Sequence, residues 1–120
     1  MLIRYKQSNE KIAMGLLSFV PGEGNLKQLQ QTMNEYATNK DWQLFMWKDE
    51  EDFTGIVGIR ILDKDTAELQ HVSVNPSHRG QGLGKKMVQT LLDLLDGRYH
   101  LIPDKRTRAF FERCGFGDVQ

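Results

Sequence analysis

Three alternate glycines followed by two lysines lie in the second half of this 120-residue chain, at Gly80, Gly82, Gly84, Lys85 and Lys86. An apolar, strand-like run precedes them, and apolar residues at helical spacing begin within them. Backbone N–H groups in the first turn of a helix lack internal partners, and glycine lets a ligand approach the backbone closely. With the adjacent positive charges, this arrangement predicts a site for phosphate oxygens, although such glycines can also form a simple tight turn.

Two common phosphate loops do not fit these residues. A nucleoside-triphosphate loop needs Ser or Thr after Gly-Lys, but Lys86 follows Gly84-Lys85, and Arg79 stands where the first glycine should be. A dinucleotide loop of the form Gly-x-Gly-x-x-Gly would need glycine at position 85. Neither type of nucleotide loop is therefore expected.

A third pattern fits better. The segment Arg79-Gly-Gln-Gly-Leu-Gly84 has the form Arg/Gln-x-x-Gly-x-Gly/Ala and resembles the acetyl-CoA-binding motif of the GNAT family of acetyltransferases. The later segment Ala109–Phe116 is similar to the family's Ala-x-Tyr-Glu-Lys-x-Gly-Phe signature. More narrowly, the chain resembles small acetyltransferases encoded in riboflavin operons of Firmicutes.

The resemblance implies which residues would hold acetyl-CoA. Loop N–H groups would bind the pyrophosphate, and the backbone of the preceding strand would lie along the pantetheine arm. That strand would carry a bulge whose N–H polarises the thioester carbonyl, and no metal is expected. The cofactor-binding residues implied are Val72, Ser73, Val74, Arg79, Gly80, Gln81, Gly82, Leu83, Gly84, Lys85, Asp104 and Phe111.

The reaction implied is direct attack of an amine on the thioester. Because an ammonium has no lone pair, a base must remove a proton, and Glu68 aligns with a strand position where the family often places that base. Glu68 could equally be an exposed member of a cross-strand ion pair. Strand alternation would send His71 to the opposite face from Glu68 and Gln70, which favours a packed histidine.

Three departures from the family pattern limit the inference. Phe111 stands where a tyrosine usually protonates the leaving thiolate, and Asp104 replaces a common asparagine. The family usually continues with two more strands, whereas this sequence ends at Gln120. We therefore expect an acceptor side that is open or covered by a second copy in a homodimer. The Pro21–Asn25 loop and the preceding helix would form most of its wall.

The surrounding pattern predicts the elements that position these residues. Strands are expected at 2–5, 42–47, 55–62, 67–74 and 99–102, and helices at 12–20, 25–37, 83–95 and 106–114. Asn25 is expected to cap the second helix, with Leu26 on its apolar face. The fold class expected is a mixed α/β domain spanning residues 1–120. It has a mostly antiparallel sheet flanked by helices and matches a GNAT fold truncated at its C-terminus.

Composition narrows the partners and the location. Acidic and basic residues number 16 each, so the net charge is zero and neither nucleic acid nor a membrane is an expected partner. The single cysteine and the absence of a signal-like N-terminus favour the cytoplasm. Three functions remain open. One is an acetyl-CoA-dependent N-acetyltransferase acting on a small-molecule or protein amine, and another is a non-catalytic CoA-binding regulatory module. The third is a purely structural subunit whose loop binds nothing.

Overall fold

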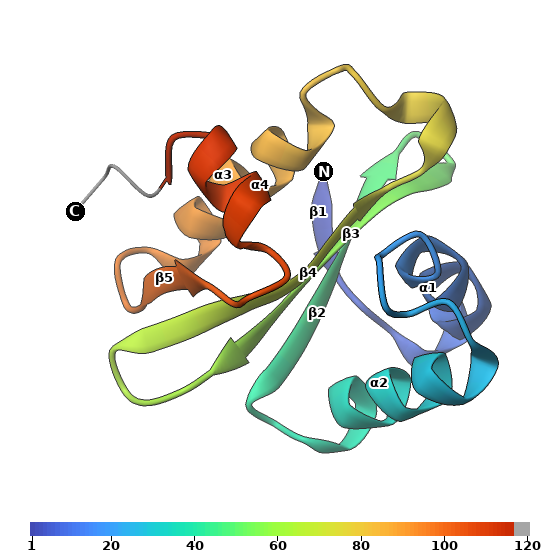
Figure 1. The fold of residues 1–120 in the computed structure, drawn as a ribbon, viewed down its shortest axis with the longest axis horizontal. Helices are drawn as coiled ribbons and strands as arrows, with labels where there is room; N and C mark the ends of the chain where they lie inside the picture. Colours follow the sequence, from blue (N-terminus) through green and yellow to red (C-terminus); the bar gives the residue numbers. More distant parts are fainter. Residues whose placement is uncertain (117–120) are drawn as a thin grey trace.

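A computed structural model describes residues 1–116, in which five strands form one mixed sheet in the order β1-β2-β3-β4-β5 (Figure 1). The strands are β1 (Leu2–Arg4), β2 (Trp42–Asp49), β3 (Asp52–Ile61), β4 (Thr66–Val74) and β5 (His100–Pro103). The helices are η1 (Gln7–Asn9), α1 (Glu10–Leu17), α2 (Leu26–Thr38), η2 (Pro76–His78), α3 (Leu83–Leu95) and α4 (Arg108–Arg113). This is the mixed α/β fold expected from the sequence.

The sheet opens on one side of β4. Strands β1 to β4 pair antiparallel, while β4 and β5 pair parallel through Thr66–Leu69 and His100–Pro103. Within residues 1–116, β4 has no strand partner on this side beyond Leu69. The C-terminal half of β4 therefore offers a backbone edge to anything bound between it and α4.

A bulge interrupts β4 just before this open half. Ile59 of β3 pairs with Leu69 and Gly58 pairs with His71, so Gln70 is one residue more than β3 matches. An extra residue reverses which face the following side chains point to. His71 consequently shares a face with Glu68, and the expectation from simple alternation that the two lie on opposite faces is wrong.

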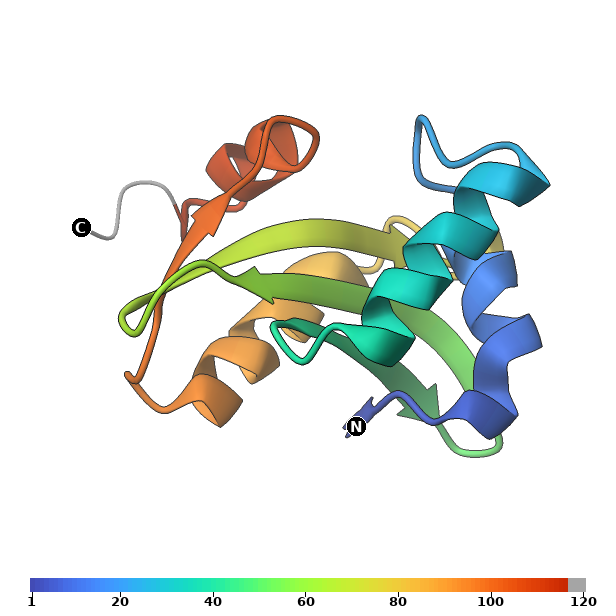
Figure 2. The same ribbon diagram turned by 90° about the horizontal axis from the view of Figure 1, so that it is seen from below.

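Two helical layers cover the sheet (Figure 2). Helices α1 and α2 pack on one face through a buried cluster that includes Leu17, Met33 and Ile56. Helix α3 packs on the other face through Met87 and Leu91, as expected for an amphipathic helix. This cluster also contains Phe111 of α4.

Helix positions match the local signals to within three residues at each end. Helix α3 spans the expected residues, and Asn25 caps α2 by accepting a hydrogen bond from the backbone N–H of Gln28 at 2.7 Å. Helix α1 ends at Leu17, three residues earlier than expected, and Leu26 is 63% exposed rather than part of the buried face of α2. The expected short extension after Phe116 lies outside the described residues. No helix among residues 1–116 is long and apolar enough to cross a membrane.

Candidate functional site

A cavity of about 580 Å³ lies between the open half of β4, the glycine loop and α4. Helix α3 begins at the loop, so its first backbone N–H groups lie at this cavity. Thr107, Phe110 and Cys114 line it from the side of α4. Of the residues predicted to bind the cofactor, those that line the cavity are Val72, Ser73, Val74, Arg79, Gly80, Gly82, Leu83, Gly84 and Lys85.

The loop needs glycine for two different reasons. Gly80 and Gly82 have φ angles of 81° and 73°, in the left-handed region that residues with a Cβ rarely adopt. Gly84 lies under the ring of Phe110, and a Cβ there would be 3.0 Å from that ring. Arg79 is held in place because its Nε donates a hydrogen bond to the carbonyl of Val74 at 3.2 Å. The glycine conformations and the Arg79 hydrogen bond thus fix the backbone of the loop beside the cavity.

The β4 wall carries a polar atom with no partner. Within the described part of the chain, the buried Ser73 Oγ accepts and donates no hydrogen bond, and Ser73 lines the cavity. A bound molecule with polar groups would satisfy this hydroxyl. The backbone N–H groups at the start of α3 and this orphaned hydroxyl both fit the acetyl-CoA implied by the sequence.

Four residues predicted for the site do not line this cavity. Gln81 lines a separate hollow of about 340 Å³. Asp104 accepts hydrogen bonds from the backbone N–H groups of Arg106 and Thr107, which shapes the turn before α4. Phe111 is buried against Phe116. Glu68 is half-buried and accepts a hydrogen bond from the side-chain amide of Gln70.

A second cavity of about 450 Å³ lies next to the first. The same three segments line both cavities, with Pro21, Val72 and Thr107 in the first and Glu23, His71 and Arg106 in the second. Helix α2 supplies the remaining wall through Gln28, Gln31, Thr32, Asn34 and Glu35, with Trp42 beside it. The Pro21–Asn25 loop, predicted to form part of an acceptor wall, lines this cavity through Glu23, and α2 rather than α1 lies beside it.

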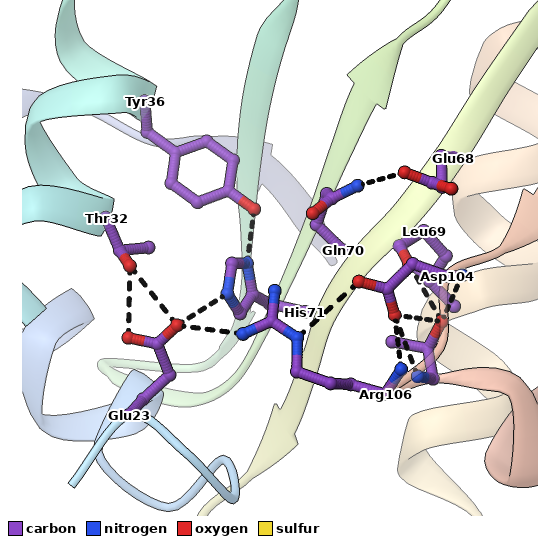
Figure 3. A network of polar contacts seen from close by, with 10 residues as sticks. Glu23, Thr32, Tyr36, Glu68, Leu69, Gln70, His71, Asp104 and Arg106 are labelled. Carbon is purple, nitrogen blue, oxygen red and sulfur yellow. Dashed lines mark hydrogen bonds and ion pairs between the residues drawn. The ribbon is translucent and has the colours of Figure 1, made fainter. Parts of the chain in front are cut away.

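A buried polar network forms the inner wall of this second cavity (Figure 3). The Tyr36 hydroxyl lies 2.6 Å from Nδ1 of His71, and Nε2 of His71 lies 3.1 Å from Oε1 of Glu23. Arg106 Nη1 donates to the same Oε1 at 3.1 Å. The Thr32 hydroxyl lies 3.2 Å from Oε1 and 3.0 Å from Oε2. Both Glu23 and His71 have only 1% of the side chain exposed.

The protonation of the network follows from its geometry and burial. Burial raises the pKa of Tyr36 well above 10.0, so its hydroxyl stays protonated and donates a hydrogen bond to Nδ1 of His71. The ring proton of His71 is then on Nε2, and this N–H donates a hydrogen bond to Glu23. Burial also lowers the pKa of His71, which the hydrogen bond to Glu23 opposes and the Arg106 charge reinforces. The imidazole is therefore neutral and fixed in one tautomer.

The sequence did not identify this network. Glu23 stands in a short glycine-flanked loop, Tyr36 reads as part of an apolar helix face, and Arg106 is 83 residues from its partner Glu23. His71 was noticed, but simple alternation placed it on the other face. The one local sign of the network in the sequence was that Glu23 is an acidic residue between two glycines.

Comparison with known proteins supports the family resemblance found in the sequence. The family model described as the Acetyltransferase (GNAT) family matches residues 8–116. An uncharacterized N-acetyltransferase in the lysA 3' region of Bacillus methanolicus is 55% identical over 114 residues, covering 95% of this chain and 94% of that protein. The match therefore extends over nearly the full length of both chains.

Solved structures of acetyltransferases share the fold. An acetyltransferase from Thermus thermophilus has a TM-score of 0.76 at 15% identity, covering 96% of this chain and 84% of that chain. A GNAT family acetyltransferase from Elizabethkingia anophelis with acetyl-CoA bound has a TM-score of 0.72 at 14% identity, covering 97% and 73%. With a family model that spans most of its residues and a relative of more than half identical sequence, the chain belongs to the GNAT family of acetyltransferases.

Proposed function

We propose that this protein is an acetyl-CoA-dependent N-acetyltransferase that uses two adjoining cavities, one for acetyl-CoA and one for the amine. The observation that carries the proposal is that the same three segments line both cavities, with the adjacent residues His71 and Val72 of β4 lining one cavity each just after the bulge. Direct transfer requires donor and acceptor to be bound side by side. The acetyl-CoA-bound relative from Elizabethkingia anophelis supports the choice of donor.

The roles of the donor cavity follow from its lining. The N–H groups of the loop and of the first turn of α3 would bind the pyrophosphate, with Arg79 and Lys85 adding charge. The backbone of Val72–Val74 would pair with the pantetheine arm, and the orphaned Ser73 hydroxyl would gain a partner. Gln81, Asp104 and Phe111, which lie outside this cavity, remain predicted contacts that only a bound ligand can test.

Two carboxylates near the bulge are candidates for the base that deprotonates the amine. Glu68 remains the base predicted from sequence, and it has a hydrogen-bonded position beside Gln70. Turnover of a Glu68→Gln variant across pH tests it, and full turnover would remove Glu68 from the mechanism. The second carboxylate, Glu23, lines the acceptor cavity directly.

One observation favours a non-catalytic alternative. Phe111 is buried and has no proton to give, so the side chain that usually protonates the CoA thiolate is replaced. A thiol has a pKa near 8.5, so thiolate can leave near neutral pH and take its proton from solvent. The missing phenol is therefore compatible with catalysis but also with a CoA-binding module that has lost it.

Two measurements separate these functions. Titration calorimetry with acetyl-CoA and CoA tests the donor cavity, and an absence of heat at high micromolar ligand would contradict both functions. Release of CoA thiol across a panel of small amines, peptide amines and amines related to riboflavin tests transfer. Binding of acetyl-CoA with no thiol release across the panel would favour the regulatory module. Light scattering in the same buffer tests the homodimer suggested by the sequence.

A further inference from the structure

One carboxylate oxygen of Glu23 has fewer hydrogen-bond partners than the other. Oε1 lies within hydrogen-bond distance of His71 Nε2, Arg106 Nη1 and the Thr32 hydroxyl. Among the described residues, Oε2 has only the Thr32 hydroxyl as a partner, at 3.0 Å. A carboxylate oxygen can accept two hydrogen bonds. Oε2 therefore retains an acceptor position in a side chain that lines the second cavity.

His71 cannot take a proton in this arrangement without losing a contact. Its Nδ1 accepts from the Tyr36 hydroxyl, and its Nε2–H donates to Glu23. A further proton would have to replace the Tyr36 hydrogen bond at a ring that is 1% exposed. Tyr36 and His71 thus hold the Glu23 carboxylate in place, and Glu23 is the member of the network that can accept a proton.

The rest of the cavity indicates the kind of molecule it suits. Three of its side chains are amides, Gln28, Gln31 and Asn34, and a second carboxylate comes from Glu35. The charged groups that line it are thus two carboxylates and the Arg106 guanidinium, which is 39% exposed. Amides and carboxylates favour a cationic molecule that also carries hydroxyl or amide groups.

We propose that Glu23 binds the acceptor as a primary ammonium and takes its proton, that His71 and Tyr36 position the carboxylate, and that the acceptor is a small hydrophilic amine. This inference rests on the proposed acetyltransferase function. The amine nitrogen gives one proton to Glu23 and forms a bond with the acetyl carbon. The C–S bond then breaks, the nitrogen loses a second proton to solvent, and the CoA thiolate takes a proton from solvent.

This assignment differs from the sequence-based choice of Glu68. Glu68 lines neither of the two adjoining cavities, and its carboxylate is engaged by Gln70. Glu23 lines the second cavity, and Pro21 of the same loop lines the donor cavity, so Glu23 lies where the two cavities adjoin. An ammonium bound to Glu23 would consequently lie near His71 and Val72, the residues just after the bulge that line one cavity each.

The first experiment measures ammonium binding without acetyl-CoA. Methylammonium is titrated into isotope-labelled protein, and backbone amide signals are followed by NMR. We expect saturable shifts at Glu23, Thr32 and His71. In Glu23→Gln, which lacks the charge, we expect the affinity to fall at least about tenfold. Tetramethylammonium carries the same charge but no N–H group, and it should bind more weakly to the wild type.

Two variants provide the comparison. Glu51→Gln removes one charge from the exposed β2–β3 turn and should leave methylammonium binding unchanged. Glu68→Gln should also leave it unchanged if Glu23 is the binding group. Shifts confined to residues around Glu68, or equal affinity in Glu23→Gln and wild type, would overturn the proposal. An absence of saturable shifts in the wild type would overturn it as well.

Arg106, the half-exposed partner of Glu23, offers a second variant in case Glu23→Gln does not fold. Arg106 competes with the ammonium for Glu23, so Arg106→Gln should bind methylammonium more tightly than wild type. Unchanged or weaker binding in this variant would contradict the model of competition and the proposal with it. Calorimetry with acetyl-CoA on the same samples keeps the outcomes separate. Its failure would reject the proposed donor, whereas loss of ammonium selectivity alone would reject the role of Glu23.

Discussion

Gly58 gives the most direct test of the Tyr36–His71–Glu23 network, because the space above it is occupied by Tyr36. Gly58 lies on β3 opposite His71. A Cβ built at Gly58 would lie 1.9 Å from the Tyr36 hydroxyl oxygen and 2.5 Å from the ring carbon that carries it. Non-bonded heavy atoms prefer about 3.5–4.0 Å. In Gly58→Ala the tyrosine hydroxyl must therefore move by roughly 1.5 Å or more.

Tyr36 has little room for that movement. Its ring is buried and packs edge-on against Trp42 with centroids 5.2 Å apart. A shift of this size would also break its 2.6 Å hydrogen bond to His71. Overpacking costs about 1–3 kcal/mol and a lost hydrogen bond costs about 0.5–1.5 kcal/mol. We expect a decrease of about 2–4 kcal/mol in the free energy of unfolding, which corresponds to a melting temperature lower by on the order of 10 °C.

A second glycine supplies a matched control. Gly15 lies exposed within α1, and a Cβ there would have no heavy atom within 4 Å beyond its own helix and neighbours. Gly15→Ala should therefore raise stability by about 0.5–1 kcal/mol, since alanine favours the helix. The same chemical change is thus expected to have opposite signs at the two positions.

The assay combines urea unfolding, calorimetry with acetyl-CoA and turnover of an amine. Neither Gly58 nor Tyr36 lines the donor cavity, so Gly58→Ala should retain acetyl-CoA affinity while amine turnover falls. The reasoning would be refuted by Gly58→Ala with wild-type stability and wild-type amine turnover. Loss of acetyl-CoA binding in a folded Gly58→Ala variant would show instead that the two cavities are not separate.

Three further predictions test other parts of the structure. Gly82→Val places a β-branched residue at a φ of 73° and should weaken CoA binding at least about tenfold. Calorimetry measures this affinity, and an unchanged value would contradict the assignment of the loop to CoA. Asn25→Ala removes the cap of α2 and should cost about 1 kcal/mol in urea unfolding, so an unchanged midpoint would argue against the cap. Because burial lowers the pKa of His71 below 6.5, the unfolded chain binds more protons than the folded one just below pH 6.5. Stability should therefore fall as the pH drops through 6.5, and His71→Asn should flatten this dependence in melting curves; an equal slope in both proteins would contradict it.

Local signals were sufficient for most of the fold. The apolar spacing of α3 and the capping side chain of Asn25 act within one helix, so the sequence alone predicts both. The burial of Leu26 was predicted wrongly, since helical spacing cannot show how far the sheet extends under the start of α2. The glycine loop was recognised because its residues are contiguous and their conformational requirements are local.

The acceptor side could not be predicted in the same way. The family resemblance implied a bulge in this strand, but nothing in the sequence of β4 alone places it at Gln70. Glu23 is held by hydrogen bonds with Thr32, His71 and Arg106, which come from three distant segments of the chain. Contacts of this kind depend on the assembled fold, so the residues looked like an ordinary loop acid and an ordinary strand histidine.

The bulge explains why one strand can serve both cavities. If β4 alternated regularly, His71 would point toward α3, and the face that meets Glu23 would lack its imidazole. The extra residue turns His71 toward Glu23 just after Leu69, the last residue of β4 that pairs with β5. The Leu69 carbonyl in turn accepts hydrogen bonds from the Thr107 hydroxyl at 2.8 Å and from the Asp104 N–H at 3.2 Å.

These hydrogen bonds fix the segment that carries Arg106 at the point where β4 leaves β5. Arg106 lines the second cavity and its neighbour Thr107 lines the first, as His71 and Val72 do on β4. Two consecutive residues on each of two facing segments therefore form the boundary at which a thioester and an amine could meet. Under the proposed function, the bulge and this anchor together would set the position of the reaction, which is why neither the glycine motif nor the late motif alone could locate it.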